Sequence, residues 1–211
     1  VDTRFFRHKP ITFQGQEMLI ARSGWSLQGG FEIYLVGFEH GEALWDALFE
    51  AGADLDVRAG CPNLIERIEG GLLSYGNDIT LEHTPFEAGF GKYCNMDTDT
   101  GCLGHGALLE KQNPARQFRP IEVDGDPIPN VPQLWPLKTL SGEPAGTISS
   151  ATWSPDFHTN VAIGMVHKGA WEPGTHLLVD THKGTREARV REKFWTRSSV
   201  AAGLAQTADV V

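Results

Sequence analysis

The chain has 211 residues, enough for one or two compact domains with a sizeable core. Its formal net charge is −9, and it contains no Lys/Arg block with interleaved aromatic residues, so we expect no nucleic-acid partner. It contains no signal-peptide pattern and no apolar run long enough to cross a bilayer, so we expect no membrane partner. Three cysteines at spacings that fit neither a disulfide framework nor a Cys-x-x-Cys metal site indicate a reducing, cytoplasmic compartment.

The first elements that the sequence predicts are strands. Residues 11–22 contain two strand-like runs on either side of Gln14-Gly15-Gln16, which predicts a β-hairpin. The run FEIYLV, residues 31–36, predicts a further strand.

Two amphipathic helices are predicted next. Residues 41–52 place apolar side chains at helical spacing and end at a glycine that suits a helix C-terminus; these residues are Leu44, Trp45, Leu48, Phe49 and Gly52. The second helix is expected to begin at Pro62, because proline is favoured at the first helical position. Its apolar stripe consists of Leu64, Ile65, Ile68 and Leu72. Glu66, Arg67 and Glu69 lie off that stripe.

The character of the sequence changes near Arg116. Beyond this point recurrent prolines exclude long helices, and short apolar runs alternate with Gly-containing turns, which predicts an antiparallel β-barrel or β-sandwich. We therefore predict an α+β fold, with an α+β domain over residues 1–115 and a β domain over residues 116–211. The last stretch, residues 198–211, has neither periodicity nor capping signals and is expected to be a loose tail.

A candidate ligand site lies in the strand around Glu32. Alternation along a strand puts Glu32 and Tyr34 on one face. A carboxylate accepts hydrogen bonds from adjacent N–H donors, and the aminopyrimidine ring of a pterin presents such donors. Trp25 and Tyr34 offer aromatic faces that attract a cation. The alternative is that Glu32 is exposed on an edge strand or paired with an arginine, and that Trp25 belongs to the core.

Other kinds of site lack their signals. The eight histidines include no His-Glu-x-x-His and no other recognisable ligand spacing, so we assign no metal. The glycine-rich stretches lack the following helix or the lysine of a phosphate-binding loop, and there is no Gly-x-Ser-x-Gly nucleophile elbow.

Several motifs, in order, resemble those of the folate-dependent aminomethyltransferases, the family of the glycine-cleavage T-protein. The resemblance runs from the first residues to about Trp195. The segment SGWSLQGGFEIY stands where T-proteins have Gly-Tyr-Thr-Gly-Glu-Asp-Gly-Phe-Glu, and ERIEGGLLSYGNDITLEHTPFEAGFGKY resembles their Arg-Leu-Glu-Ala-Gly, Leu-Tyr-Gly and Pro-Leu-Glu-Ala run. Farther on, GCLGHGALL, AGTISSATWSPDFHTNVAIGMV, PGTHLLVD and ARVREKFW resemble a family motif and the strands of its C-terminal barrel. The resemblance implies a ferredoxin-like α+β folate-binding portion followed by an antiparallel β-barrel.

Within the family, GCPNLIERIEGGLLSYGND and the tryptophan of SGWS resemble the branch that moves a methyl group from the sulfonium compound dimethylsulfoniopropionate to tetrahydrofolate. Two departures from glycine-cleavage enzymes are Asn63, where these have arginine, and His105, where they have lysine. The family's reaction-centre aspartate has no counterpart here, so we expect no catalytic residue in this chain. The chain resembles a C-terminal fragment, expected to be inactive alone.

The resemblance also implies roles for individual residues. Glu32 would hold the pterin of tetrahydrofolate, and Tyr75 would line the folate channel. Trp25 and Tyr34 would contact the small-molecule methyl donor. Arg67 is expected to be structural, paired with Glu66, with Glu69 or with a distant carboxylate. A homodimer is left open.

Three other functions remain as alternatives. The first is aminomethyl transfer from a lipoyl carrier, as in the glycine cleavage system, and the second is folate-dependent demethylation of another N- or O-methyl donor. The third is not enzymatic: some relatives bind folate while assisting iron–sulfur cluster assembly. Their Lys-Gly-Cys-Tyr-x-Gly-Gln-Glu signature is replaced here by AGCPNLIERIE, and Trp25 argues against the carrier-dependent case.

Overall fold

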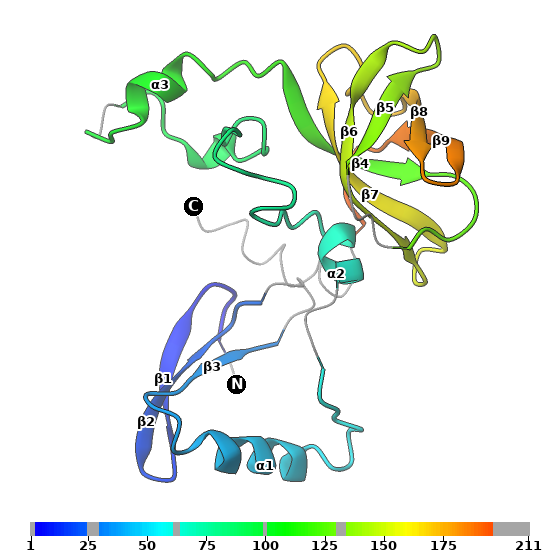
Figure 1. Cartoon of the computed structure of the whole chain (residues 1–211). Coiled ribbons are helices and arrows are strands. Elements are labelled where there is room, and N and C mark those ends of the chain that lie inside the picture. Colours follow the sequence, from blue (N-terminus) through cyan, green and yellow to red (C-terminus); the bar gives the residue numbers. More distant parts are fainter. Residues whose placement is uncertain (1–2, 25–29, 61–63, 99–100, 130–133, 196–211) are drawn as a thin grey trace. The chain divides into compact units, whose positions relative to one another are not determined.

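A computed structural model describes residues 3–24, 30–60, 64–98, 101–129 and 134–195 (Figure 1). The chain divides into two compact units, one containing the residues up to Glu66 and the other running from Arg67 to Trp195. Trp25, Pro62 and the tail expected at residues 198–211 lie outside the described residues. In the part of the chain that is described, no helix is long and apolar enough to span a membrane.

The first unit contains the predicted hairpin. Strand β1 (His8–Phe13) pairs antiparallel with β2 (Gln16–Ala21). The two residues between them, Gln14 and Gly15, have φ of 48° and 81°. Two consecutive positive φ values match the twist of a two-residue hairpin turn, which explains the tight connection.

The third strand of this sheet is shorter than predicted. Strand β3 (Glu32–Tyr34) pairs antiparallel with β2, which gives the sheet order β1-β2-β3. The sequence predicted a strand over residues 31–36, but only its second, third and fourth residues pair. The chain turns shortly afterwards at Gly37, which has a φ of 81° that glycine adopts without steric cost.

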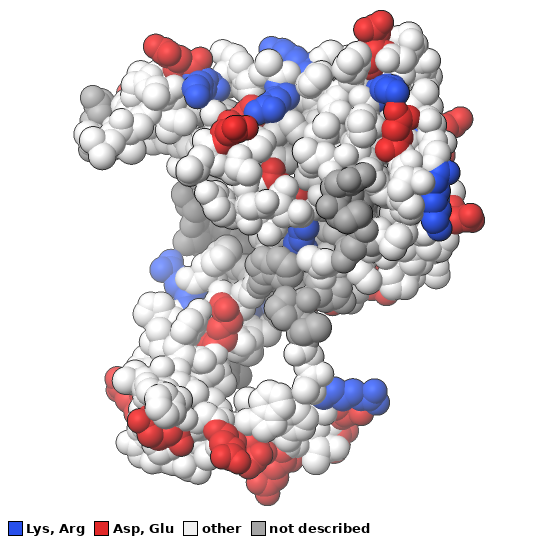
Figure 2. All heavy atoms as spheres, in the orientation of Figure 1, with Lys and Arg blue, Asp and Glu red and all other residues white. Residues whose placement is uncertain are grey.

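Helix α1 (Gly41–Ala51) confirms the first predicted helix, and the N–H of Gly52 donates to the carbonyl of Leu48. Exposed acidic side chains lie along it, and Figure 2 shows them as a red patch; they are Glu42, Asp46 and Glu50. Its apolar stripe is only partly covered by described residues, since Trp45 is 53% exposed and Leu48 is 49% exposed.

Helix α2 (Leu64–Glu69) ends earlier than the apolar stripe suggested, because Leu72 lies beyond it. The N–H of Leu72 donates to the carbonyl of Arg67, and the N–H of Gly71 donates to that of Ile68. Gly71 has a φ of 71°, so these bonds form a Schellman motif with glycine in the left-handed position. The turn η1 (Gly91–Tyr93) and helix α3 (His105–Leu109) follow.

The rest of the second unit is a closed antiparallel barrel, which decides between the barrel and the sandwich that the sequence left open. Its order is β4-β7-β6-β5-β8-β9, and pairing of β9 with β4 closes it (Figure 1). The strands are β4 (Arg116–Val123), β5 (Trp135–Thr139), β6 (Pro144–Ser154), β7 (Thr159–His167), β8 (His176–Thr181) and β9 (Gly184–Val190). The α+β fold with a C-terminal barrel is therefore confirmed.

Two apolar clusters stabilise this unit. Among the described residues, one buried cluster fills the barrel interior and includes Ile121, Leu137 and Leu177. A second cluster lies on the other side of β4 and β7 and joins these strands to α2; it contains Ile68, Phe118, Val161, Ile163, Met165 and Trp195. Alternation along β4 explains both clusters, because Phe118 and Ile121 point to opposite faces of the sheet. This second cluster fixes α2 and the turn that follows it against the barrel wall.

Candidate functional site

Glu32 and Tyr34 share the exposed face of the three-stranded sheet. The register places Glu32 opposite Ala21 and Tyr34 opposite Leu19. Both side chains are exposed, Tyr34 by 50%. Among the described residues, no arginine or lysine forms an ion pair with Glu32, so its carboxylate remains available for a ligand that donates N–H groups.

One protein group does bind this carboxylate. The hydroxyl of Ser23 donates a hydrogen bond to Oε2 of Glu32. A carboxylate has about four acceptor positions, and no other described residue binds this one, so within the described part of the chain Oε1 and the second position on Oε2 remain open. Trp25, the other residue expected near Glu32, lies outside the described residues, so the structure brings together Glu32 and Tyr34 alone.

Tyr75, the second expected folate residue, belongs to the other unit. It lies in the turn between α2 and the rest of that unit, and its side chain is 69% exposed. The turn is closed by a bridge between Tyr75 and Ile79 and by a hydrogen bond of 2.8 Å from the N–H of Gly76 to the carbonyl of Ile79. Gly76 has a φ of 85°, which allows this reversal.

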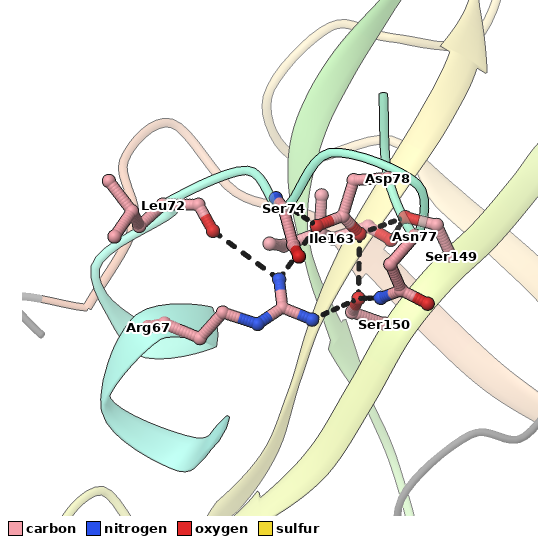
Figure 3. Close-up of polar contacts among 8 residues, drawn as sticks. All are labelled: Arg67, Leu72, Ser74, Asn77, Asp78, Ser149, Ser150 and Ile163. Atoms are coloured by element: carbon pink, nitrogen blue, oxygen red, sulfur yellow. Dashed lines mark hydrogen bonds and ion pairs between the residues drawn. The ribbon is translucent and has the colours of Figure 1, made fainter. Parts of the chain in front are cut away.

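A buried polar cluster lies beneath this turn (Figure 3). Its centre is Asp78, which is 3% exposed. Oδ2 of Asp78 accepts hydrogen bonds from Nη1 of Arg67 at 2.6 Å and from the backbone N–H of Ser74 at 2.8 Å. Oδ1 accepts hydrogen bonds from the hydroxyls of Ser149 and Ser150, both at 2.6 Å. All four acceptor positions of the carboxylate are therefore filled by the protein.

An irregularity in β6 brings the two serines to the same carboxylate. The β6–β7 register pairs Ile148 with Gly164 and then Ser150 with Ile163, so Ser149 is an extra residue. Neighbouring residues of a regular strand point to opposite faces, whereas a β-bulge redirects one of them. The bulge thus lets both hydroxyls reach Asp78 in the second unit.

The sequence allowed Glu66, Glu69 or a distant carboxylate as the partner of Arg67. The structure shows the distant carboxylate, that of Asp78. Besides Asp78, its guanidinium donates to Oγ of Ser150 at 2.7 Å and to the carbonyl of Leu72 at 3.3 Å. The side chains of Arg67 and Asp78 are 2% and 0% exposed. Because the acceptors of Asp78 are occupied, this pair fixes the turn against the barrel and offers no carboxylate to a ligand.

Sequence reasoning did not find Asp78, Ser149 or Ser150. A weak signal existed in the two adjacent serines of β6, a strand whose other central residues are mostly apolar and buried. Consecutive polar residues in a strand buried on both faces need partners, since an unsatisfied buried hydroxyl is costly. Those partners come from sequence positions more than seventy residues away.

A separate polar contact joins the loop before the barrel to its first strand. Nε of Arg116 donates to Oε1 of Glu87 at 2.7 Å, and the backbone N–H of Thr84 donates to Oε2 at 2.7 Å. Glu87 borders a cavity of about 250 Å³ that none of the expected site residues lines. Burial raises the pKa of Glu87, but the hydrogen bonds from Arg116 and Thr84 outweigh it and hold the pKa below its ordinary value of 4.5.

This contact predicts a pH-dependent contribution to stability. A carboxyl whose pKa is depressed by folding stabilises the protein above its unfolded pKa and loses that effect as the pH falls through the folded pKa. Since the Arg116 side chain is 40% exposed, we expect Glu87→Gln to cost only about 0.5 to 1 kcal/mol at pH 7. Urea unfolding of both proteins should show this difference shrinking below pH 4.5; a difference that stays constant down to acid pH would contradict the assignment.

The comparisons with known proteins agree with this architecture. The profile of the GCVT N-terminal domain matches residues 1–98, and that of the glycine cleavage T-protein C-terminal barrel domain matches residues 116–195. The chain belongs to the glycine-cleavage T-protein family. The family that the motifs predicted is thereby confirmed.

Individual T-protein relatives span a range of similarity. The chain is 56% identical over 92% of its length to dimethylsulfoniopropionate demethylase DmdA of Ruegeria pomeroyi, and covers 53% of that protein. It is 32% identical over 90% of its length to an aminomethyltransferase of Symbiobacterium thermophilum, and covers 51% of it. The crystal structure of glycine cleavage system aminomethyltransferase T from Bartonella henselae has the same fold, with a TM-score of 0.73 at 24% identity over 92% of this chain and 55% of that one. The chain thus spans about half the length of the relatives it matches.

The family domains can be placed on the structure. The T-protein barrel profile begins at Arg116, the first residue of β4, and its range contains all six barrel strands. Glu32, Tyr34 and Tyr75 all fall in the range of the N-terminal-domain profile, as do Arg67 and Asp78. The buried cluster therefore joins residues of one T-protein domain to the barrel of the other, through Ser149 and Ser150 on β6.

Proposed function

We propose that the chain is part of a tetrahydrofolate-dependent methyltransferase whose methyl donor is dimethylsulfoniopropionate and whose products are methyltetrahydrofolate and methylmercaptopropionate. The observation that carries this proposal is the 56% identity over nearly the whole chain with a protein named for that demethylation, against 32% with the aminomethyltransferase of Symbiobacterium thermophilum. For the domains, we propose the division at residues 115 and 116 that the sequence predicted.

We assign to Glu32 the binding of the pterin ring. Its carboxylate is exposed, forms no ion pair among the described residues and keeps at least two acceptor positions free. Two adjacent N–H donors of an aminopyrimidine ring match these positions, and hydrogen bonds to a charged acceptor are stronger than neutral ones. Tyr75, with its exposed ring, is proposed to line the folate channel.

We assign the methyl donor to Trp25 and Tyr34. Aromatic faces attract cations, and Tyr34 lies on the same sheet face as Glu32, so a cationic donor and the pterin would be held side by side. Bound tetrahydrofolate would supply the N5 electron pair that takes the methyl group and would then lose the N5 proton to solvent, while the electrons of the broken C–S bond remain on sulfur and give a neutral thioether. Because the leaving group departs neutral, these residues act by positioning and by excluding water.

The function is tested with the full-length protein, tetrahydrofolate and dimethylsulfoniopropionate. Formation of methyltetrahydrofolate and methylmercaptopropionate in equal amounts is the expected result. Parallel reactions contain a lipoyl-bound aminomethyl donor, a methylated glycine or an aromatic methyl ether. Turnover of one of these, with none of the sulfonium compound, would replace the proposal by the corresponding aminomethyltransferase or demethylase.

The role of Trp25 gives a further prediction. Trp25→Leu keeps apolar bulk but removes the aromatic quadrupole, so dimethylsulfoniopropionate should bind more weakly by about 1 to 2 kcal/mol while tetrahydrofolate binding is unchanged. Calorimetry of both ligands on the full-length protein measures this. The control ligand is 4-methylpentanoate, in which CH replaces the sulfonium; equal losses for the cation and this neutral isostere would mean that Trp25 contributes packing alone.

A further inference from the structure

The hydrogen bond from Ser23 to Glu32 follows from the register of the sheet. Ala21, the last residue of β2, lies opposite Glu32, and Ser23 follows two residues later, so both side chains lie on the face of Glu32. A diagonal neighbour at this spacing is within reach of a glutamate side chain. The Ser23 hydroxyl donates a hydrogen bond to Oε2 of Glu32 across this diagonal.

The backbone that directly precedes Ser23 is hydrogen-bonded into the sheet. The N–H of Arg22 donates to the carbonyl of Arg7 at 2.9 Å, and the carbonyl of Arg22 accepts from the N–H of Phe6 at 2.9 Å, so the ladder continues past the end of β2. Nη1 of Arg22 also donates to the carbonyl of Thr3 at 3.1 Å. Ser23 itself is half-buried, whereas Glu32 is exposed. Ser23 therefore follows backbone that is hydrogen-bonded into the sheet, and its short side chain faces the longer side chain of Glu32.

We propose that Ser23 is a positioning residue that orients the Glu32 carboxylate for the pterin ring. The inference rests on the proposed function and adds a residue to its folate site. Glutamate has three rotatable side-chain bonds, and ordering them when a ligand binds costs conformational entropy. A hydrogen bond to Oε2 reduces that cost before the ligand arrives. It also leaves Oε1 and one position of Oε2 free for two adjacent N–H donors.

A positioning role and a structural role for Ser23 predict different experimental results. Removing its hydroxyl should weaken tetrahydrofolate binding because Glu32 must then be ordered by the ligand. It should leave dimethylsulfoniopropionate binding and kcat at saturating folate unchanged, since neither depends on the free orientation of Glu32. The loss should also depend on the Glu32 carboxylate being present. A hydroxyl that merely supports the sheet would instead change the stability of the protein and affect both ligands.

The experiment is a double-mutant cycle on the full-length protein, with tetrahydrofolate affinity measured by calorimetry. We expect Ser23→Ala to weaken binding about threefold to tenfold, the range set by the entropy of ordering one long side chain, and Ser23→Thr to restore it to within about twofold. In the Glu32→Gln background, Ser23→Ala should have less than about a twofold effect. The matched control is Thr12→Val, which removes an exposed hydroxyl from β1 of the same sheet and should change nothing.

Each outcome decides between the two proposals. If Glu32→Gln weakens folate binding but Ser23→Ala does not, the positioning role fails and the proposed function stands. If Ser23→Ala has the same effect with and without Glu32, the hydroxyl acts on something other than Glu32 and the inference fails. If Glu32→Gln leaves folate binding unchanged, the pterin assignment and the positioning role both fail. Thermal unfolding of each variant identifies a loss that comes from a damaged fold, which would also overturn the positioning role.

Discussion

Replacing Asp78 by asparagine is expected to lower the free energy of unfolding of the full-length protein by about 3 to 5 kcal/mol, the cost of leaving a buried partner charge uncompensated. Arg67 is 2% exposed and cannot turn to solvent, so its charge remains in the interior without a counter-ion. Asparagine also has a single acceptor oxygen, so one of the two pairs of groups that now donate to Asp78 would lose its acceptor. Urea unfolding monitored by tryptophan fluorescence measures the loss.

The chain contains a matched control for this substitution. Asp56 and Arg58 form the same kind of ion pair at 2.9 Å, but their side chains are 78% and 77% exposed. Asp56 has a φ of 52°, which asparagine tolerates as well as aspartate does. Asp56→Asn should therefore cost less than about 1 kcal/mol, as exposed ion pairs do. Equal effects of the two substitutions would show that burial does not give the Arg67–Asp78 pair its importance.

The reciprocal change tests whether the pair acts as a unit. Arg67→Met leaves the Asp78 carboxylate buried with three neutral donors, and it should destabilise the protein by a similar amount. Combining it with Asp78→Asn removes both charges, so the double variant should be more stable than the sum of the single losses predicts. If the losses are additive instead, each residue stabilises the protein through its own hydrogen bonds and the two charges do not act as a pair.

Local signals predicted the elements of this fold well. The hairpin over residues 11–22 and the helix over residues 41–52 depend on alternation, helical spacing and turn residues that are neighbours in the sequence. Arg67 illustrates the limit of such signals. The sequence offered Glu66, Glu69 or a distant carboxylate as partners, and the structure uses Asp78, eleven positions away, together with Ser150, 83 positions away.

Closure of the barrel and the bulge in β6 could not be predicted from local signals either, because both depend on pairing between residues that are far apart in the sequence. Pairing of β9 with β4 joins Val190 to Ile121, and a strand pattern alone fits a sandwich as well as a barrel. The bulge at Ser149 changes which face a side chain takes, and one extra residue leaves no trace in the apolar pattern. One geometric feature of the candidate site was within reach of local signals: alternation places Glu32 and Tyr34 on one face, and the register of β2 and β3 puts them there.

Replacing Glu32 by glutamine should weaken tetrahydrofolate binding by the full-length protein by about 1.5 to 3 kcal/mol, the range for hydrogen bonds to a charged group. Glutamine keeps the size of the side chain and one acceptor oxygen, but its amide nitrogen would face an N–H donor of the pterin. Because Glu32 is exposed and forms no ion pair among the described residues, folding should be unaffected. Calorimetry with tetrahydrofolate measures the loss, and thermal unfolding checks the fold.

A second substitution separates this contact from the general charge of the sheet. Glu17 lies on β2, is exposed, and has the same strand parity as Leu19 and Ala21, so it shares the face of Glu32. Glu17→Gln removes the same charge from the same surface without touching the proposed pterin position, and it should leave folate affinity unchanged. If both glutamine variants lose affinity equally, long-range electrostatics would account for the effect and the pterin contact would be wrong. If Glu32→Gln alone loses affinity, while dimethylsulfoniopropionate binds each variant as it binds the parent protein, the carboxylate recognises the pterin ring itself.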